Sequence, residues 1–168
     1  DGTPFSNYDY YGEYKDIIKG IHIIDEPKND ELDIVASKTL IDDFKSAYPN
    51  AKYIVNLIPV YGAYDYGFTT SDNMMNVFGE KIMSQFETPC ISVDIYPFHN
   101  KVTDADMYLA TNHEMFAKAA KKYNGKKAYI LQASTGEEFH QELTEGDMRW
   151  QVYAALGFGA DMLQYYCY

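Results

Sequence analysis

Five short apolar runs recur along the chain and predict five β-strands. They begin near Gly20, Tyr53, Cys90, Ala128 and Asp161, at intervals of roughly 33 to 38 residues, about the length of one βα unit. Each run is four to eight residues long and rich in β-branched or aromatic side chains, which is typical of a strand. The regular spacing therefore indicates a repeated strand–connection unit.

The stretches between these runs carry hydrophobic residues at helical spacing. This spacing predicts a helix after each of the first four strands, each with one apolar face that packs on the sheet. In chain order the four faces are Leu32, Ala36, Leu40 and Phe44; then Phe78, Ile82 and Phe86; then Leu109, Met115, Phe116, Ala119 and Ala120; and last Met148, Val152, Tyr153 and Leu156. Thr103 or Asp104 can cap the third helix, and Thr144 with Asp147 resembles a capping box. A further helix is predicted over residues 8–19.

Alternation of strands and helices predicts a parallel sheet of α/β class. Two architectures fit it: an open, doubly wound, flavodoxin-like sheet of five strands, which suits the length, or part of a (β/α)8 TIM barrel, which normally needs about 250 residues. A doubly wound sheet buries both faces of its strands. Here one face gathers the more polar alternate residues, namely His22, Glu26, Asn56, Asp94, Tyr96, Gln132, Gln164 and Tyr166. This pattern favours the barrel, with residues 1–168 as a single, incomplete barrel domain.

Composition narrows the choice of ligand. The net charge of −11 disfavours nucleic acid as a partner, and the chain has no apolar run of about 18 residues that would span a membrane. Four His and two Cys show no metal-ligand spacing, so neither a metal nor a cofactor is implied. Tyr is abundant, with 17 residues; this fits either a tyrosine-rich core or a cleft that stacks on sugars.

Two acidic positions are candidates for chemistry. Asp25 and Glu26 close the first predicted strand just before Pro27, where barrel enzymes place catalytic groups, although acids there can also simply favour a helix N-terminus. Asp94 interrupts an apolar strand, and a buried carboxylate is costly unless it is hydrogen-bonded or functional. A structural, hydrogen-bonded Asp94 is the alternative.

These motifs together resemble a family. The segments Asp-Glu-Pro, Val-Asn-Leu-Ile-Pro, Ile-Ser-Val-Asp-Ile-Tyr-Pro-Phe and Ile-Leu-Gln, followed by Arg-Trp-Gln-Val-Tyr-Ala-Ala-Leu-Gly-Phe-Gly-Ala at 149–160, are similar to the barrel of bacterial glycoside hydrolases related to β-galactosidases and cellulases. The likeness covers about residues 20–168. It implies that the five strands are the fourth to eighth of a barrel whose first strands lie in upstream chain.

The resemblance also implies roles for particular residues. Glu26 matches the general acid/base that ends the fourth strand, with Asp25 in place of the usual Asn. Gln132 stands where the clan has its nucleophilic Glu, and an amide cannot act as that carboxylate. Three explanations stay open: Asp94, Glu137 or Glu138 supplies the second carboxylate; the substrate assists; or the module is inactive.

The resulting hypothesis is a glycoside hydrolase that cleaves O-glycosidic bonds with Glu26 and Asp94 as catalytic carboxylates. The residues expected to bind substrate are Asp25, Asn56, Tyr96, Gln132, Gln164 and Tyr166. A non-catalytic carbohydrate-binding barrel and a flavodoxin-like binding module are the alternatives. The family resemblance further suggests a secreted or cell-envelope protein.

Overall fold

The computed structural model describes residues 14–99, 102–134 and 142–166. Its five strands, β1 (Gly20–Asp25), β2 (Lys52–Leu57), β3 (Cys90–Ile95), β4 (Lys126–Gln132) and β5 (Met162–Tyr166), form one sheet in sequence order. Every neighbouring pair is parallel, as predicted. The consecutive order differs from the 2-1-3-4-5 order of flavodoxin-like sheets, so the doubly wound alternative is wrong.

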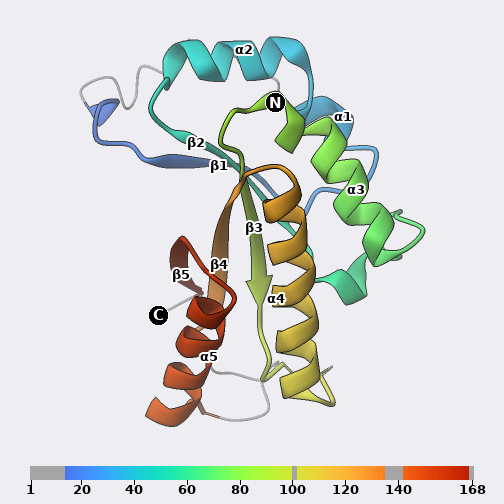
Figure 1. Cartoon of the computed structure of the whole chain (residues 1–168), viewed down its shortest axis with the longest axis vertical. Coiled ribbons are helices and arrows are strands. Elements are labelled where there is room, and N and C mark those ends of the chain that lie inside the picture. Colours follow the sequence, from blue (N-terminus) through green and yellow to red (C-terminus); the bar gives the residue numbers. More distant parts are fainter. Residues whose placement is uncertain (1–13, 100–101, 135–141, 167–168) are drawn as a thin grey trace.

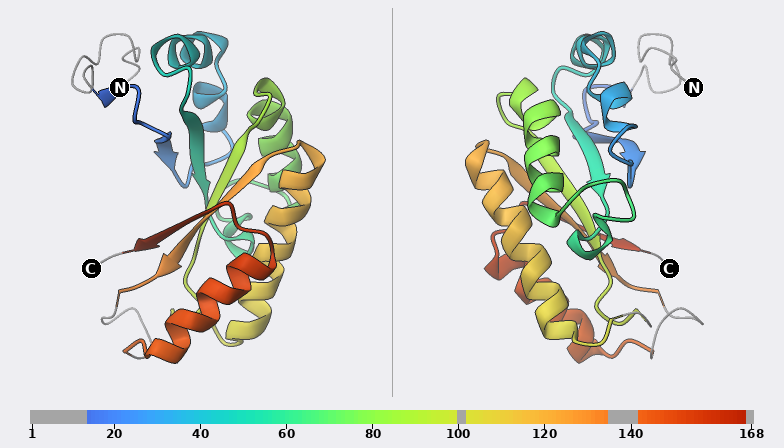
Figure 2. Two further views of the ribbon diagram at one scale, coloured as in Figure 1. Left: turned by 60° about the vertical axis from the view of Figure 1, so that its left-hand side comes forward. Right: turned by 90° about the vertical axis from the view of Figure 1, so that its right-hand side faces the viewer.

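The sheet curls into a half-barrel, and its helices cover the outside of the curl (Figure 1). Figure 2 shows the helices gathered on this convex face, while the concave face stays open. The two edge strands approach each other across the concave face, where His22 Nε2 of β1 lies 3.1 Å from Gln164 Oε1 of β5. Curling therefore brings together side chains that a flat sheet would hold far apart.

The two faces of the sheet are packed differently. Outward residues of the central strands, such as Val55, Val93 and Leu131, are fully buried in one large core with the helices. On the concave face, Ile54, Cys90 and Ala128 form a small separate apolar cluster with Met162 against it. Polar residues follow this cluster toward the strand C-termini, as the alternation in the sequence predicted.

Two predicted helices are shorter than expected. The first breaks at Ser37, which is extended, into α1 (Leu32–Val35) and α2 (Lys38–Ala47). After the 3-10 turn η3 (Val60–Gly62), the second divides into α3 (Ser71–Lys81) and the 3-10 turn η4 (Met83–Gln85). Residues 14–19 include only a turn in place of the predicted helix, the rest of which lies outside the described residues.

The other two helices agree with the sequence in position and capping. Asp104 caps α4 (Ala105–Lys122) by accepting a hydrogen bond from the backbone N–H of Met107. Thr144 and Asp147 form the predicted capping box at the start of α5 (Glu145–Gly157). Within the described part of the chain, no helix is both long and apolar enough to cross a membrane.

A β-bulge changes the orientation of β1. The register with β2 slips between His22 and Ile24, so Ile24 pairs with Val55 and Asp25 pairs with Asn56. A bulge inserts one unpaired residue and reverses the alternation beyond it. Beyond the bulge, Ile24 packs against the large convex core, and Asp25 takes the inward position, where it accepts a hydrogen bond from Asn56.

Candidate functional site

A cleft of about 1060 Å³ opens at the C-terminal ends of the first three strands. Five acidic residues line it, namely Asp25, Glu26, Asp65, Asp94 and Asp104. Five tyrosines line it as well, namely Tyr61, Tyr66, Tyr96, Tyr108 and Tyr166. Among the described residues of this lining, none is Lys or Arg. The cleft therefore repels anions and presents hydroxyl and carboxylate groups to whatever enters it.

Asn56 lies at the centre of the acidic cluster. Its side-chain Nδ2 donates to Oδ1 of Asp25 at 2.9 Å and to Oδ1 of Asp94 at 3.1 Å. Its Oδ1 accepts a hydrogen bond from the Ser92 hydroxyl at 2.9 Å. The two carboxylate oxygens share one donor nitrogen, so they lie no farther apart than those first two distances together.

Glu26 reaches the cleft through an unusual backbone conformation. Its φ of 43° falls in the left-handed region, which residues other than Gly adopt infrequently, and Pro27 disfavours the ordinary helical conformation at this position. The Glu26 N–H donates to the carbonyl of Asn56 at 2.8 Å, and Glu26 Oε2 accepts from the Tyr66 hydroxyl at 2.7 Å. Both the backbone and the carboxylate of Glu26 are thus held in place.

The electrostatics of the cluster centre on Asp94, which is only 8% exposed. Burial and the nearby charge of Glu26, with a smaller effect of Asp25, raise the pKa of Asp94 to about 7, against the lowering effect of the hydrogen bond from Asn56. The hydrogen bond to Glu26, together with burial and nearby carboxylates, raises the pKa of Tyr66 to about 12. Asp94 can therefore hold a proton near neutral pH while Tyr66 remains a donor.

Aromatic side chains stack in two pairs within the cleft. Tyr61 and Tyr108 have ring centroids 5.3 Å apart, and Tyr96 and Tyr166 have centroids 5.6 Å apart, both in stacked geometry. Burial first, and then the charge of Asp94, raise the pKa of Tyr96 and of Tyr108. Asp94 thus acts on one ring of each pair, and both pairs border the acidic cluster.

The structure brings most of the predicted site residues together. Glu26, Asp94, Asp25, Asn56, Tyr96 and Tyr166 all line the cleft, and so does His99, which follows β3. Tyr66, Tyr61 and Tyr108 were missed. Tyr66 could have been noticed because it lies in the tyrosine-rich loop directly after β2, where barrel-type sites collect their residues.

Two predicted substrate-binding residues do not line the cleft. Gln132 is fully buried: its Oε1 accepts from the Phe98 N–H at 3.0 Å, and its backbone exchanges hydrogen bonds with the side chain of Gln151. Gln164 lies deeper on the concave face, bonded to His22. Gln132 therefore serves the structure, whereas Gln164 is only half-buried. Glu137 and Glu138 lie outside the described residues.

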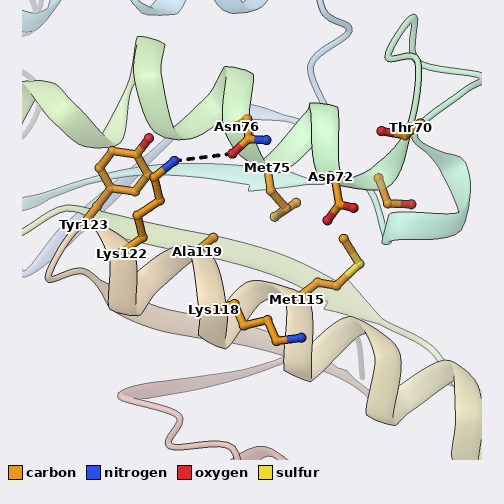
Figure 3. Close-up of a pocket in the computed structure, with 10 residues that line it drawn as sticks. Thr70, Asp72, Met75, Asn76, Met115, Lys118, Ala119, Lys122 and Tyr123 are labelled. Carbon is orange, nitrogen blue, oxygen red and sulfur yellow. Dashed lines mark hydrogen bonds between the residues drawn. The ribbon is translucent and has the colours of Figure 1, made fainter.

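A second hollow, of about 500 Å³, lies between α3 and α4 on the convex side (Figure 3). Met75, Met115 and Tyr123 contribute to its walls, and Lys122 Nζ lies 3.4 Å from Asn76 Oδ1. It lacks the grouped carboxylates of the cleft. In the described residues, no group of three or more His, Cys, Asp or Glu side chains is arranged to hold a metal ion.

Comparison of the chain with family models, with curated proteins and with solved structures finds no match. The geometry of the cleft is therefore the guide to its chemistry.

Proposed function

We propose that this chain forms the C-terminal half of a (β/α)8 barrel that hydrolyses O-glycosidic bonds. The parallel, consecutive strand order and the one-sided helix layer support the barrel. So does the contact between His22 and Gln164, because strands four positions apart face each other across an eight-stranded barrel. The missing strands would come from upstream chain and would close the open concave face.

The observation that carries the proposal is a buried, proton-holding Asp94 beside further carboxylates at the strand C-termini. Glycosidic cleavage needs one carboxylic acid to protonate the leaving oxygen and a second carboxylate to attack or to activate water. The raised pKa of Asp94 suits the acid. Glu26, whose carboxylate oxygen accepts a hydrogen bond from Tyr66, suits the second role. This assignment differs from the family resemblance, which implies that Glu26 is the general acid/base.

Asp25 is an alternative second carboxylate. Its shared donor with Asp94 keeps the two groups close enough for the roughly 5 Å separation of retaining enzymes. The buried Gln132 has no part in this scheme, so the missing clan nucleophile does not by itself make the site inactive. The acidic, tyrosine-rich walls favour neutral sugars over phosphorylated or otherwise anionic substrates.

Turnover by the full chain, including its upstream barrel residues, tests this proposal. Reducing-sugar release from a panel of neutral oligosaccharides should be measured for wild type, Glu26→Gln and Asp94→Asn. Each variant should lose about 10²- to 10⁴-fold in kcat/KM, the usual contribution of an acid/base group. Asp106→Asn and Glu114→Gln are matched controls at exposed positions of α4 and should keep the wild-type rate.

A non-catalytic carbohydrate-binding barrel is the second candidate, favoured by Gln132 at the expected nucleophile position. It predicts saturable binding of an oligosaccharide with no release of reducing sugar. Binding that survives in Glu26→Gln and Asp94→Asn, without turnover in wild type, would replace the hydrolase proposal with this one.

A further inference from the structure

Asn56 bonds to three acidic residues at the strand ends, to the carboxylates of two and to the backbone of the third, although the sequence predicted it to bind substrate. Its side chain donates to Asp25 and Asp94, and its backbone carbonyl accepts from the N–H of Glu26. The residue is 1% exposed. With its side-chain nitrogen and oxygen both engaged inside the protein, it is poorly placed to offer a free group to a ligand.

The direction of the Asn56 amide is fixed by the chemistry of its partners. An ionised carboxylate can only accept hydrogen bonds, so the NH₂ group must face Asp25. The oxygen then faces Ser92, which is fully buried and whose hydroxyl donates to it. Rotating the amide by half a turn would place its oxygen against the carboxylates, so the carboxylates select the orientation and the Ser92 hydroxyl, which can donate or accept, adopts the donor role.

We propose that Asn56 is a positioning residue that sets the placement of Asp25, Asp94 and Glu26, and that the hydrogen bond from Ser92 helps to hold its amide in place. The inference does not depend on the substrate, because it concerns the carboxylates in the free protein. One NH₂ group divided between two carboxylates holds them near each other while offsetting part of their repulsion. Without it, the same two groups would face each other with no donor between them.

The titration of Asp94 reports this role directly. The groups that face Asp94 are Asp25 from the end of β1, Glu26 directly after it, Asn56 from β2, and the rings of Tyr96 and Tyr108. Of these, Asn56 supplies a side-chain hydrogen bond that favours the charged form. Its removal should therefore raise the pKa of Asp94, whereas a loss of packing alone would have no such direction.

The experiment follows the Asp94 carboxyl carbon by NMR through a pH titration of the full chain, with Asp94→Asn to assign the signal. In Asn56→Leu, which keeps the approximate shape, the midpoint should rise by about one pH unit or more, as expected for loss of a charge-assisted hydrogen bond. Ser92→Ala should shift the midpoint in the same direction by a smaller amount, because the amide oxygen then loses the hydrogen bond that helps to hold the side chain in place.

Asn112→Leu is the matched control. Asn112 is equally buried, and its amide oxygen and nitrogen are both hydrogen-bonded, to the Val60 N–H and the Tyr108 carbonyl, with no carboxylate among these partners. It should lower the melting temperature and leave the Asp94 midpoint within about 0.3 units. An unchanged midpoint in Asn56→Leu, or an equal shift in Asn112→Leu, would overturn the proposal. If Asn56→Leu does not fold, an unchanged midpoint in Ser92→Ala does so. Because no substrate is used, the result is independent of whether the protein is a glycosidase.

Discussion

The two faces of the curled sheet handle buried polar groups in opposite ways. On the concave face, Asn56, Ser92 and Asp94 are buried together, and each hydrogen-bonds to at least one of the others. On the convex face, His113 of α4 is fully buried between the rings of Tyr129 and Phe158. Neither of its ring nitrogens has a partner among the described residues.

This difference indicates that the two faces of the sheet have different roles. Burial lowers the pKa of His113 to about 4, so the convex core keeps this side chain neutral and treats it as part of an apolar layer. On the concave face, burial beside two other acids raises the pKa of Asp94 to about 7. Perturbed acids in a cleft are typical of functional sites, whereas the convex layer supplies most of the stability.

The largest expected effect lies in the convex core. Phe116 is fully buried on α4, so Phe116→Ala should reduce the free energy of unfolding by about 3–5 kcal/mol. Tyr153→Ala on α5, where the ring is 69% exposed, should change it by less than about 0.5 kcal/mol. Denaturant unfolding measures both. A loss of under 1 kcal/mol for Phe116→Ala, about what an average substitution costs, would show that Phe116 is not part of the core.

Replacing Asp94 should stabilise the protein at high pH, whereas replacing Phe116 should destabilise it. Its folded pKa of about 7 lies above the ordinary Asp value of 3.8, so the folded state binds more protons between these values and stability falls as pH rises through this window. Asp94→Asn removes that loss and should raise the free energy of unfolding at pH 8 by about 2–4 kcal/mol relative to wild type. The gain should be absent near pH 4. A destabilised variant at pH 8 would mean that the charge is satisfied in place.

His113 should make stability depend on pH in the opposite direction to Asp94, and by a smaller amount. Its folded pKa of about 4 lies below 6.5, so the unfolded state binds more protons between these values and stability falls as pH drops from 6.5 toward 4. His113→Phe should reduce this acid-side loss by about 2–3 kcal/mol. Tyr129→Phe alters the same contact without titrating in this window and should leave the slope unchanged. Equal slopes in wild type and His113→Phe would show that His113 is not buried as a neutral ring.

The sequence predicted well what depends on local pattern. Strand positions, the outward apolar residues and the caps at Asp104 and Thr144 follow from periodicity and from hydrogen bonds made within one turn of chain. The bulge in β1 could not be read from alternation, because it arises from pairing with β2. As a result, alternation alone does not place Asp25 inward, although it was expected to bind substrate.

The site was predicted in part for a related reason. Glu26 stands out because it ends a strand, and Asp94 because a carboxylate inside an apolar strand is costly; both line the cleft. The contact between Tyr66 and Glu26 joins residues 40 positions apart, and no local spacing reveals it. Gln132 was misjudged since its strand position suggests the cleft, while its actual partners are the Phe98 backbone and Gln151 of α5.

The pH dependence of oligosaccharide hydrolysis by the full chain tests the central claim most directly. If Asp94 is the general acid, kcat/KM on substrates with poor leaving groups should fall tenfold per pH unit above about pH 7, where Asp94 loses its proton. In Asp94→Asn the rate should be low and should lack this falling limb. A wild-type rate that still rises above pH 8, or a falling limb that persists unchanged in Asp94→Asn, would contradict the account.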